Sequence, residues 1–198
     1  MADDDFSLLM RWRADDRQAG EQLCARYFDE IYRFFEYKIA EKADDLVQQT
    51  FMACVRARDQ FRNDASFRTY LFTIARNELY MELRKTRRDF VDLEVSSLNE
   101  LVTSPSQLLG KQRELARLRA ALREIPVEQQ LLLELHYWHD MPAAELANMF
   151  ATTPGSIRVR LLRARRLLRD RLAGQPVVAV DRLWASLSAS DLEQPDAE

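Results

Sequence analysis

The sequence predicts an all-α protein made of two small helical domains joined by a flexible acidic linker. Its 198 residues contain four glycines and six prolines, too few for a protein built on tight β turns. Leu, Ala, Arg and Glu, which all favour helices, dominate the composition. Apolar residues also recur through most of the chain at the spacing of one helix face.

Residues 1–88 are predicted to form the first domain. No proline occurs before Pro105, so nothing in this part of the chain forces a helix to end early. The apolar spacing indicates about four helices, each with one face turned inward. The side chains expected in the core include Leu23, Tyr27, Ile31, Phe34, Phe67, Leu71 and Ile74.

Residues 89–112 are predicted to form the linker. The segment begins DFVDLEVSSLNELVTSPSQ, which carries four acidic residues and no basic one. Serine and proline occur in it without sustained periodicity. We therefore expect an acidic tether without a core of its own.

Residues 113–173 are predicted to form the second domain, and residues 174–198 a C-terminal extension. A short helix beginning near Pro142, with Asp140 as a candidate N-cap, is followed by the break ATTPG and an arginine-rich helix. This order is the outline of a helix-turn-helix, whose second helix enters the DNA major groove.

The arginine-rich helix, GSIRVRLLRARRLLRDRL, places seven arginines in a chain whose net charge is −3. Guanidinium groups bind phosphates and pair with guanine edges, which indicates a polyanionic partner. The alternative is a solvated helix held by intrahelical ion pairs, but Asp170 is the only acid between residues 156 and 171. The inward stripe is predicted at Ile157, Leu161, Ala164, Leu168 and Leu172.

The first domain has a basic end of its own. Between Arg56 and Arg88, nine Lys or Arg residues accompany four acids, with aromatic residues interleaved. Basic side chains follow the backbone of single-stranded DNA, and aromatic rings stack on its bases. The alternative is that these aromatics belong to the core, because Phe67 and Leu71 share a helix face.

Other classes of protein and site are not indicated. No stretch approaches the roughly 20 apolar residues of a membrane helix, and the start MADDDF is acidic, so we expect a cytoplasmic protein without membrane insertion. Cys24 and Cys54 are expected in the core rather than in a redox or metal site. His136 and His139 are weak signals for zinc, and we expect no metal or cofactor. Without a nucleotide loop or nucleophile motif, we expect no enzyme.

Two runs of the sequence carry a family resemblance: KADDLVQQTFMACVRARDQFRNDASFRTYLFTIARNELYMELRK in the first predicted domain, and LRAALREIPVEQQLLLELHYWHDMPAAELANMFATTPGSIRVRLLRARRLLRDRL in the second. The first run resembles region 2, and the second resembles region 4, of the extracytoplasmic function (ECF) sigma factors, the compact bacterial transcription initiation subunits. The resemblance implies a protein that binds the β and β′ subunits of core RNA polymerase, recognises a promoter and melts it, without catalytic chemistry of its own.

The resemblance also implies site residues. Docking to core polymerase is implied for Asp44, Asp45, Gln48 and Gln49, although Asp44 and Asp45 equally suit the first turn of a helix. Binding of the single-stranded −10 element is implied for Phe61, Arg62, Asn63, Asp64, Ser66, Phe67, Arg76, Asn77 and Arg84. Binding of the duplex −35 element is implied for Ser156, Arg158, Val159, Arg160, Leu162, Arg163 and Arg166. For Val159 and Leu162 the alternative is packing against a neighbouring helix.

Two further expectations follow from the resemblance. An anti-sigma factor is implied as an inhibitory partner, and the acidic linker is implied to cross the polymerase cleft. The alternative for the linker is a solvated tether, which fits its sequence equally well. A competing function from another class is a helix-turn-helix regulator whose residues 1–88 sense a partner or dimerise, and which binds duplex DNA without polymerase.

Overall fold

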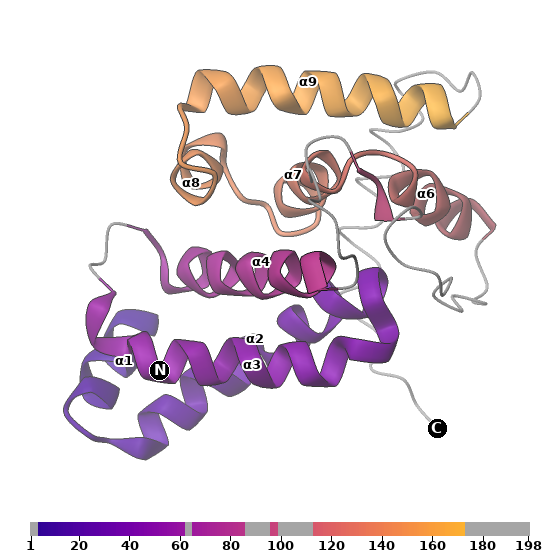
Figure 1. The fold of residues 1–198 in the computed structure, drawn as a ribbon. Helices are drawn as coiled ribbons and strands as arrows, with labels where there is room; N and C mark the ends of the chain where they lie inside the picture. Colours follow the sequence, from indigo (N-terminus) through magenta and orange to yellow (C-terminus); the bar gives the residue numbers. More distant parts are fainter. Residues whose placement is uncertain (1–3, 62–64, 86–95, 99–112, 173–198) are drawn as a thin grey trace. The chain divides into compact units, whose positions relative to one another are not determined.

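The computed structural model describes residues 4–61, 65–85, 96–98 and 113–172, and within them every named element is helical (Figure 1). The chain divides into two units, residues 1–90 and 91–198. The predicted all-α fold with two helical domains is therefore confirmed. The C-terminal extension and most of the predicted linker lie outside the described residues.

In the described part of the first unit, four α-helices pack in chain order. Helix α2 contacts α1 and α3, and α3 contacts α4. The carboxylates of Asp4 and Asp16 cap the first two helices by accepting the backbone N–H groups of Ser7 and Ala19. The helices are α1 (Asp5–Arg13), α2 (Arg17–Ile39), α3 (Ala43–Ala57) and α4 (Phe67–Lys85), with 3₁₀ turns at Ala40–Lys42 and Arg58–Gln60.

The core of this unit follows the predicted apolar stripes. Phe34 meets both Phe35 and Phe72 edge to face, with ring centroids 5.1 and 5.6 Å apart. Ile74, predicted inward, is half-buried. The other predicted positions, Leu23, Tyr27, Ile31, Phe34, Phe67 and Leu71, are buried.

The described part of the second unit is a helical bundle, and its last two helices form the predicted helix-turn-helix. Both α7 and α8 contact α9, and α6 contacts α7 and α9. The side chain of Thr153 caps α9 by accepting the N–H of Ser156, and Pro154 occupies the first turn. The helices are α6 (Arg113–Arg123), α7 (Val127–Tyr137), α8 (Ala143–Met149) and α9 (Pro154–Arg171).

The start of α8 differs from the sequence expectation. Pro142, not Asp140, occupies the N-cap position, and no side chain caps the helix. Asp140 instead adopts a left-handed backbone with φ of 48°, in the turn that follows α7. The prediction of Asp140 as N-cap was therefore wrong. Asp140 still belongs to the left-handed turn, and the extended residue that directly precedes the helix is Pro142.

The turn between α8 and α9 is stabilised by backbone hydrogen bonds. Ala151 has a left-handed φ of 48°, and the N–H of Thr152 donates to the carbonyl of Ala147 at 2.9 Å. This turn directs α9 so that one face packs on the unit. All of the predicted inward stripe is buried, at Ile157, Leu161, Ala164, Leu168 and Leu172.

A short part of the predicted linker is attached to the second unit. The N–H of Val127 donates to the carbonyl of Ser96 at 3.0 Å, and Ser97 forms an isolated bridge with Pro126. Leu98 is fully buried. Residues 96–98 are thus fixed beside the start of α7.

Within residues 4–61, 65–85, 96–98 and 113–172, no helix combines the length and hydropathy needed to cross a bilayer.

We predict that Gly20→Ala destabilises the first unit by about 1–3 kcal/mol. A Cβ at Gly20 would lie 2.5 Å from Nε1 of the buried Trp12, so the Trp12 ring or the packing of α1 on α2 would have to shift. Thermal unfolding followed by circular dichroism measures the change. Gly155→Ala is the matched control, since its nearest neighbour would lie 3.9 Å away. Equal melting temperatures for the two variants would contradict the prediction.

Candidate nucleic-acid and partner interfaces

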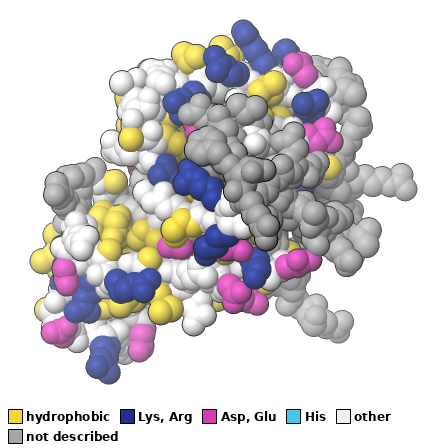
Figure 2. Space-filling model, viewed as in Figure 1, with side chains coloured by type: hydrophobic (Ala, Val, Ile, Leu, Met, Phe, Trp, Pro, Cys, Tyr) yellow, Lys and Arg dark blue, Asp and Glu magenta, His cyan; other side chains and the backbone are white. Residues whose placement is uncertain are grey.

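The outer face of α9 carries the predicted duplex-binding residues. Arg158, Arg163 and Arg166 are exposed and form no ion pair with a described residue. Val159 and Leu162 remain 60% and 45% exposed, which argues against the alternative that they pack on a neighbouring helix. In Figure 2, dark-blue basic side chains and yellow hydrophobic ones lie together along α9. The helix therefore presents cations and apolar groups on one surface.

Arg160 is positioned differently from the neighbouring arginines. Its guanidinium forms an ion pair with the carboxylate of Glu128 on α7. These two side chains, with Gln129, Leu132 and Arg163, line a cavity of about 140 Å³. No local sequence pattern indicates this pair, because 32 residues separate its members. A phosphate that contacts Arg160 would therefore compete with this internal partner for the guanidinium.

The other ion pairs of α9 are weak. Arg169 lies 3.7 Å from Asp170, and Arg171 lies 3.9 Å from Glu124, with side chains that are all at least 40% exposed. Exposed pairs at such distances contribute little to stability. The alternative of a helix stabilised by its own ion pairs is therefore not supported, and most of the positive charge is available to a partner.

In the first unit, the residues predicted to bind the −10 element lie at the turn before α4. Phe61 is half-buried, and its ring centroid lies 4.6 Å from that of Tyr70 and 6.3 Å from that of Phe67. Phe67 is buried, so the core alternative holds for this residue. The hydroxyl of Ser66 accepts the N–H of Thr69 and so caps α4. The remaining predicted residues of this turn, Arg62, Asn63 and Asp64, lie outside the described residues.

The rest of this predicted site extends along α4. Asn77 is exposed, and its Oδ1 accepts a hydrogen bond from Nη2 of Arg76 at 2.9 Å. The Arg76 guanidinium also lies over the ring of Tyr80. Arg84 is exposed two turns further on. Asn77 lies about 15 Å along the helix from Phe67 and Arg84 about 25 Å, so these side chains suit successive parts of an extended strand.

The predicted docking residues lie on the outer side of α3. Asp44, Asp45 and Gln48 are exposed and Gln49 is half-buried, while Leu46 faces the core. Both acids lie in the first turn, where a carboxylate is favoured by the helix dipole. A stabilising role of Asp44 and Asp45 in the first turn of α3 is therefore compatible with a docking role.

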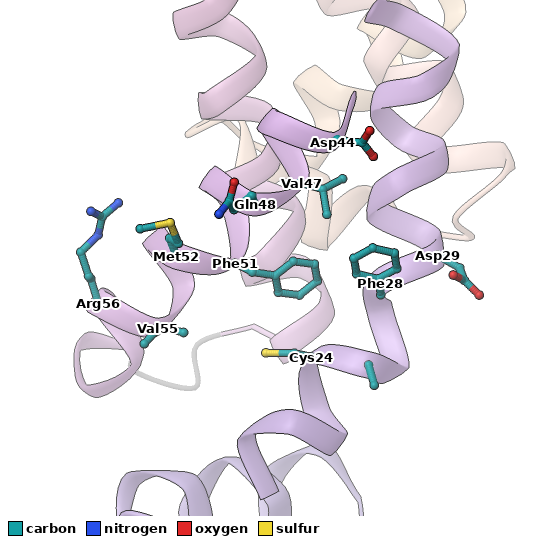
Figure 3. A pocket seen from close by; sticks show the side chains of 11 residues that line it. Cys24, Phe28, Asp29, Asp44, Val47, Gln48, Phe51, Met52, Val55 and Arg56 are labelled. Atoms are coloured by element: carbon teal, nitrogen blue, oxygen red, sulfur yellow. The ribbon is translucent and has the colours of Figure 1, made fainter. Parts of the chain in front are cut away.

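An open apolar groove of about 800 Å³ lies beside these residues, between α2 and α3 (Figure 3). The rings of Phe28 and Phe51 stack in it with centroids 6.1 Å apart. Asp44 and Gln48 lie on its border. Sequence reasoning missed the groove, although exposed Met52 and Val55 continue the face of Gln48 at helical spacing. The other lining residues are Cys24, Ala25, Asp29, Val47 and Arg56.

The two cysteines are free thiols in this region. Burial raises the pKa of Cys24 to about 11 and that of Cys54 to about 12, so both stay protonated at neutral pH. Cys54 is a core residue as predicted, whereas Cys24 is partly exposed because it lines the groove.

Family models match both units. The model for sigma-70 region 2 matches residues 25–89, and the model for sigma-70 region 4 matches residues 115–168. The chain is 31% identical to the RNA polymerase sigma factor NccH of Alcaligenes xylosoxydans xylosoxydans, over 87% of this chain and 97% of that protein. The chain belongs to the ECF sigma factors. The competing assignment as a regulator acting without polymerase is not favoured, because region 2 accounts for the first unit.

Further relatives agree with this assignment. The ECF sigma factor EcfG of Rhodopseudomonas palustris is 33% identical over 64% of this chain and 68% of its own length. BldN of Streptomyces coelicolor is 28% identical over 82% of this chain, which spans 64% of that relative. A solved structure of the Bartonella quintana sigma factor RpoE in complex with the anti-sigma factor NepR matches with a TM-score of 0.61 and 25% identity, covering 79% of this chain and 98% of that one.

We predict that Glu128→Gln increases affinity for duplex DNA. Without the carboxylate, Arg160 no longer has to exchange an internal partner for a phosphate. The slope of log affinity against log salt should steepen by about one unit. Fluorescence anisotropy titrations at several KCl concentrations measure it. Glu124→Gln is the control, because its carboxylate belongs to the exposed pair with Arg171. Equal salt slopes in both variants would refute the prediction.

Proposed function

We propose that this ECF sigma factor binds the β and β′ subunits of core RNA polymerase in the cytoplasm and directs them to a promoter with −35 and −10 elements. It acts by binding and by melting the −10 DNA, and supplies no catalytic step. The observation that carries this proposal is the pairing of a region 2 unit, which has an acidic and apolar outer surface on α3, with a region 4 unit that exposes arginines on α9.

The polymerase contact is proposed on α3 and the adjoining groove. Asp44, Asp45 and Gln48 offer carboxylates and an amide to a basic helical partner, which favours oriented association. The exposed apolar side chains of Phe28, Met52 and Val55 add surface that loses water when the partner covers it. Charge steers the contact, and apolar burial supplies most of its affinity.

The −35 contact is proposed on α9. Arg158 and Arg163 are exposed cations suited to guanine edges or phosphates, and Val159 and Leu162 are exposed apolar groups suited to thymine methyl groups. Ser156 and Arg160 are proposed at phosphates, which fix the register of the helix without reading sequence. Arg166, exposed on the same helix, extends this surface.

The −10 contact is proposed at the turn before α4 and along that helix. A base that leaves the duplex loses stacking free energy of a few kcal/mol, and melting proceeds only if the protein binds the base that is released. Phe61 supplies a half-buried ring there, and Asn77 supplies an amide that can pair with a base edge. Arg76 and Arg84 supply charge for the strand backbone.

An anti-sigma factor is proposed as a further partner. The similar structure of Bartonella RpoE contains the anti-sigma factor NepR. A protein that covers the groove beside α3 would exclude polymerase, because Asp44 and Gln48 border the same groove.

Run-off transcription with core polymerase and a promoter library tests the proposed function. We expect transcripts from a subset of promoters that share −35 and −10 sequences, and none from core polymerase alone. Purified chain that neither associates with core polymerase nor changes the transcripts would overturn the proposal.

We predict that replacing Asp45 and Gln48 together by alanine weakens polymerase association roughly tenfold, because the partner loses its charged and hydrogen-bonding contacts. A pull-down with core polymerase measures association, and circular dichroism shows that helicity is kept. The double change of Asp59 and Gln60 to alanine is the control, since it removes an exposed acid and amide at the other end of α3. Association equal to wild type would refute the docking surface.

We predict that Arg158→Ala weakens binding to the preferred −35 sequence by about 1–3 kcal/mol and relaxes the preference at one base pair. The exposed guanidinium is then a base-reading group rather than a phosphate contact. Affinities for a set of single-base −35 variants measure it, with Arg171→Ala as a control at the far end of α9. A uniform loss across all sequences would assign Arg158 to phosphate.

A further inference from the structure

We infer that Arg13, at the end of α1, is a positioning residue for promoter opening, because it fixes the turn that carries Phe61. The inference rests on the proposed function, in which the turn before α4 binds the melted −10 strand. Neither the helix-turn-helix pattern nor the resemblance to region 2 drew attention to this arginine.

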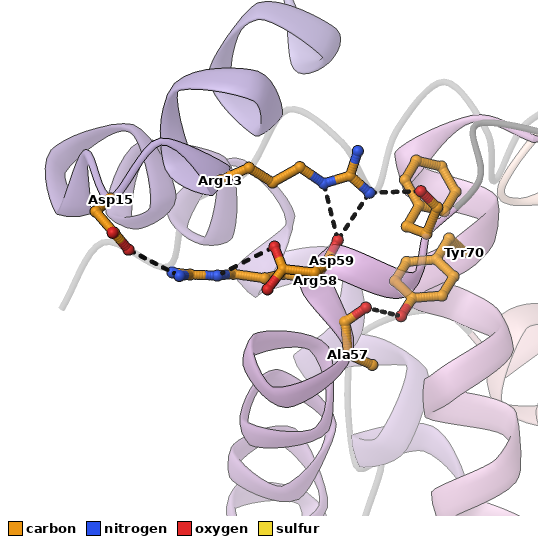
Figure 4. A network of polar contacts seen from close by, with 7 residues as sticks. Arg13, Asp15, Ala57, Arg58, Asp59 and Tyr70 are labelled. Atoms are coloured by element: carbon orange, nitrogen blue, oxygen red, sulfur yellow. Dashed lines mark hydrogen bonds and ion pairs between the residues drawn. The ribbon is translucent and has the colours of Figure 1, made fainter.

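The contacts of Arg13 are made to the backbone of a distant turn (Figure 4). Its Nε and Nη2 donate to the carbonyl of Arg58 at 3.0 and 2.8 Å. Nη2 also donates to the carbonyl of Phe61. One planar guanidinium thus bridges both ends of the short 3₁₀ turn Arg58–Gln60.

These carbonyls lie where a helix ends. The last carbonyls of α3 and its 3₁₀ turn have no helical N–H to accept, and they carry the negative end of the helix dipole. Phe61 itself is extended, with φ of −66° and ψ of 118°. Arg13 therefore stabilises the position at which the helical chain becomes extended, at Phe61, the first residue proposed to contact the −10 strand.

A second set of contacts supports the same turn from α4. The hydroxyl of Tyr70 donates to the carbonyl of Ala57 at 3.2 Å, and the Tyr70 ring lies against Phe61. Phe61 is thus held through its carbonyl by Arg13 and through its ring by Tyr70. Removing Arg13 leaves the Phe61 ring attached to Tyr70 but its backbone less restricted.

The side chain of Arg58 adds a reciprocal link. Its Nη2 lies 2.9 Å from Oδ1 of Asp15, and its guanidinium lies over the ring of Trp12. The end of α1 and the turn after α3 therefore contact each other in both directions. Arg13 differs from Arg58 because its bonds reach the backbone of Phe61 rather than a side chain.

The expected effect of losing Arg13 is kinetic. A ring held in place captures an unpaired base without first being ordered, whereas a less restricted turn must be ordered during melting. The step from closed to open promoter complex should slow, while the −35 contact and the polymerase surface on α3 are unchanged.

The experiment compares Arg13→Met, Arg13→Lys and Arg11→Met in full-length protein assembled with core polymerase. Permanganate reactivity of −10 thymines is followed over time at several holoenzyme concentrations, which separates closed-complex affinity from the opening rate. Arg11→Met is the matched control, because it removes the same charge from the same helix together with its pair with Asp16, a residue outside the turn Arg58–Gln60. Thermal unfolding and core polymerase association are measured for each variant.

The expected result is an opening rate reduced roughly tenfold in Arg13→Met, with closed-complex affinity and core association near wild type. Arg13→Lys, which keeps one donor and the charge, should open at an intermediate rate, and Arg11→Met at the wild-type rate. A defect in folding alone would lower the amplitude of opening and core association without changing the rate.

Three results would overturn the inference. These are a wild-type opening rate in Arg13→Met, the folding pattern of lowered amplitude at an unchanged rate, and an equal loss in Arg11→Met. Wild-type protein that does not open promoters with core polymerase would overturn the proposed function itself, and the inference with it.

Discussion

The constraint on which this structure depends is that each helix has to bury one face, which fixes the residues on its opposite face. In α3, burial of Leu46, Val47 and Cys54 turns Asp44, Asp45 and Gln48 outward. The packed core and the exposed surfaces are therefore two sides of the same helical period. A shift of one residue in this packing would move the acids toward the core. Interface geometry in this protein is thus as robust as its apolar packing.

The same period explains why much of the architecture could be predicted. The stripe from Ile157 to Leu172 repeats every three or four residues, so the direction of the arginines follows from local sequence alone. Contacts between distant residues leave no such pattern. Glu128 and Arg160 lie 32 residues apart, and Arg13 lies 45 residues from Arg58. In the second case the acceptor is the backbone carbonyl of Arg58. Because every residue has such a carbonyl, the residue type at that position does not indicate the contact. Asp140 shows a related limit, since it lies in a left-handed turn and the N-cap position of α8 is two residues further on, at Pro142.

Electrostatics in this chain is a matter of position more than of total charge. The net charge of −3 would disfavour DNA, yet α9 concentrates its cations on one exposed surface. The carboxylate of Glu128 competes for one of these cations. Such competition weakens binding to the phosphate backbone of every DNA sequence by the same amount. Contacts that depend on sequence then supply a larger share of the binding free energy. In the proposed function, a moderate affinity for DNA of any sequence suits a subunit that binds its promoter together with core polymerase.

The hydrogen bond between Ser96 and Val127 determines how much of the chain is left to connect the two units. Because the second unit is anchored already at Ser96, the connection from the last residue of α4 is ten residues, 86–95, rather than the full predicted linker. Ten residues, in any conformation, reach no further than about 36 Å. This short connection keeps the local concentration of each unit around the other high once either unit is bound to its target. It also limits the spacing between two DNA elements that one molecule can bind at once.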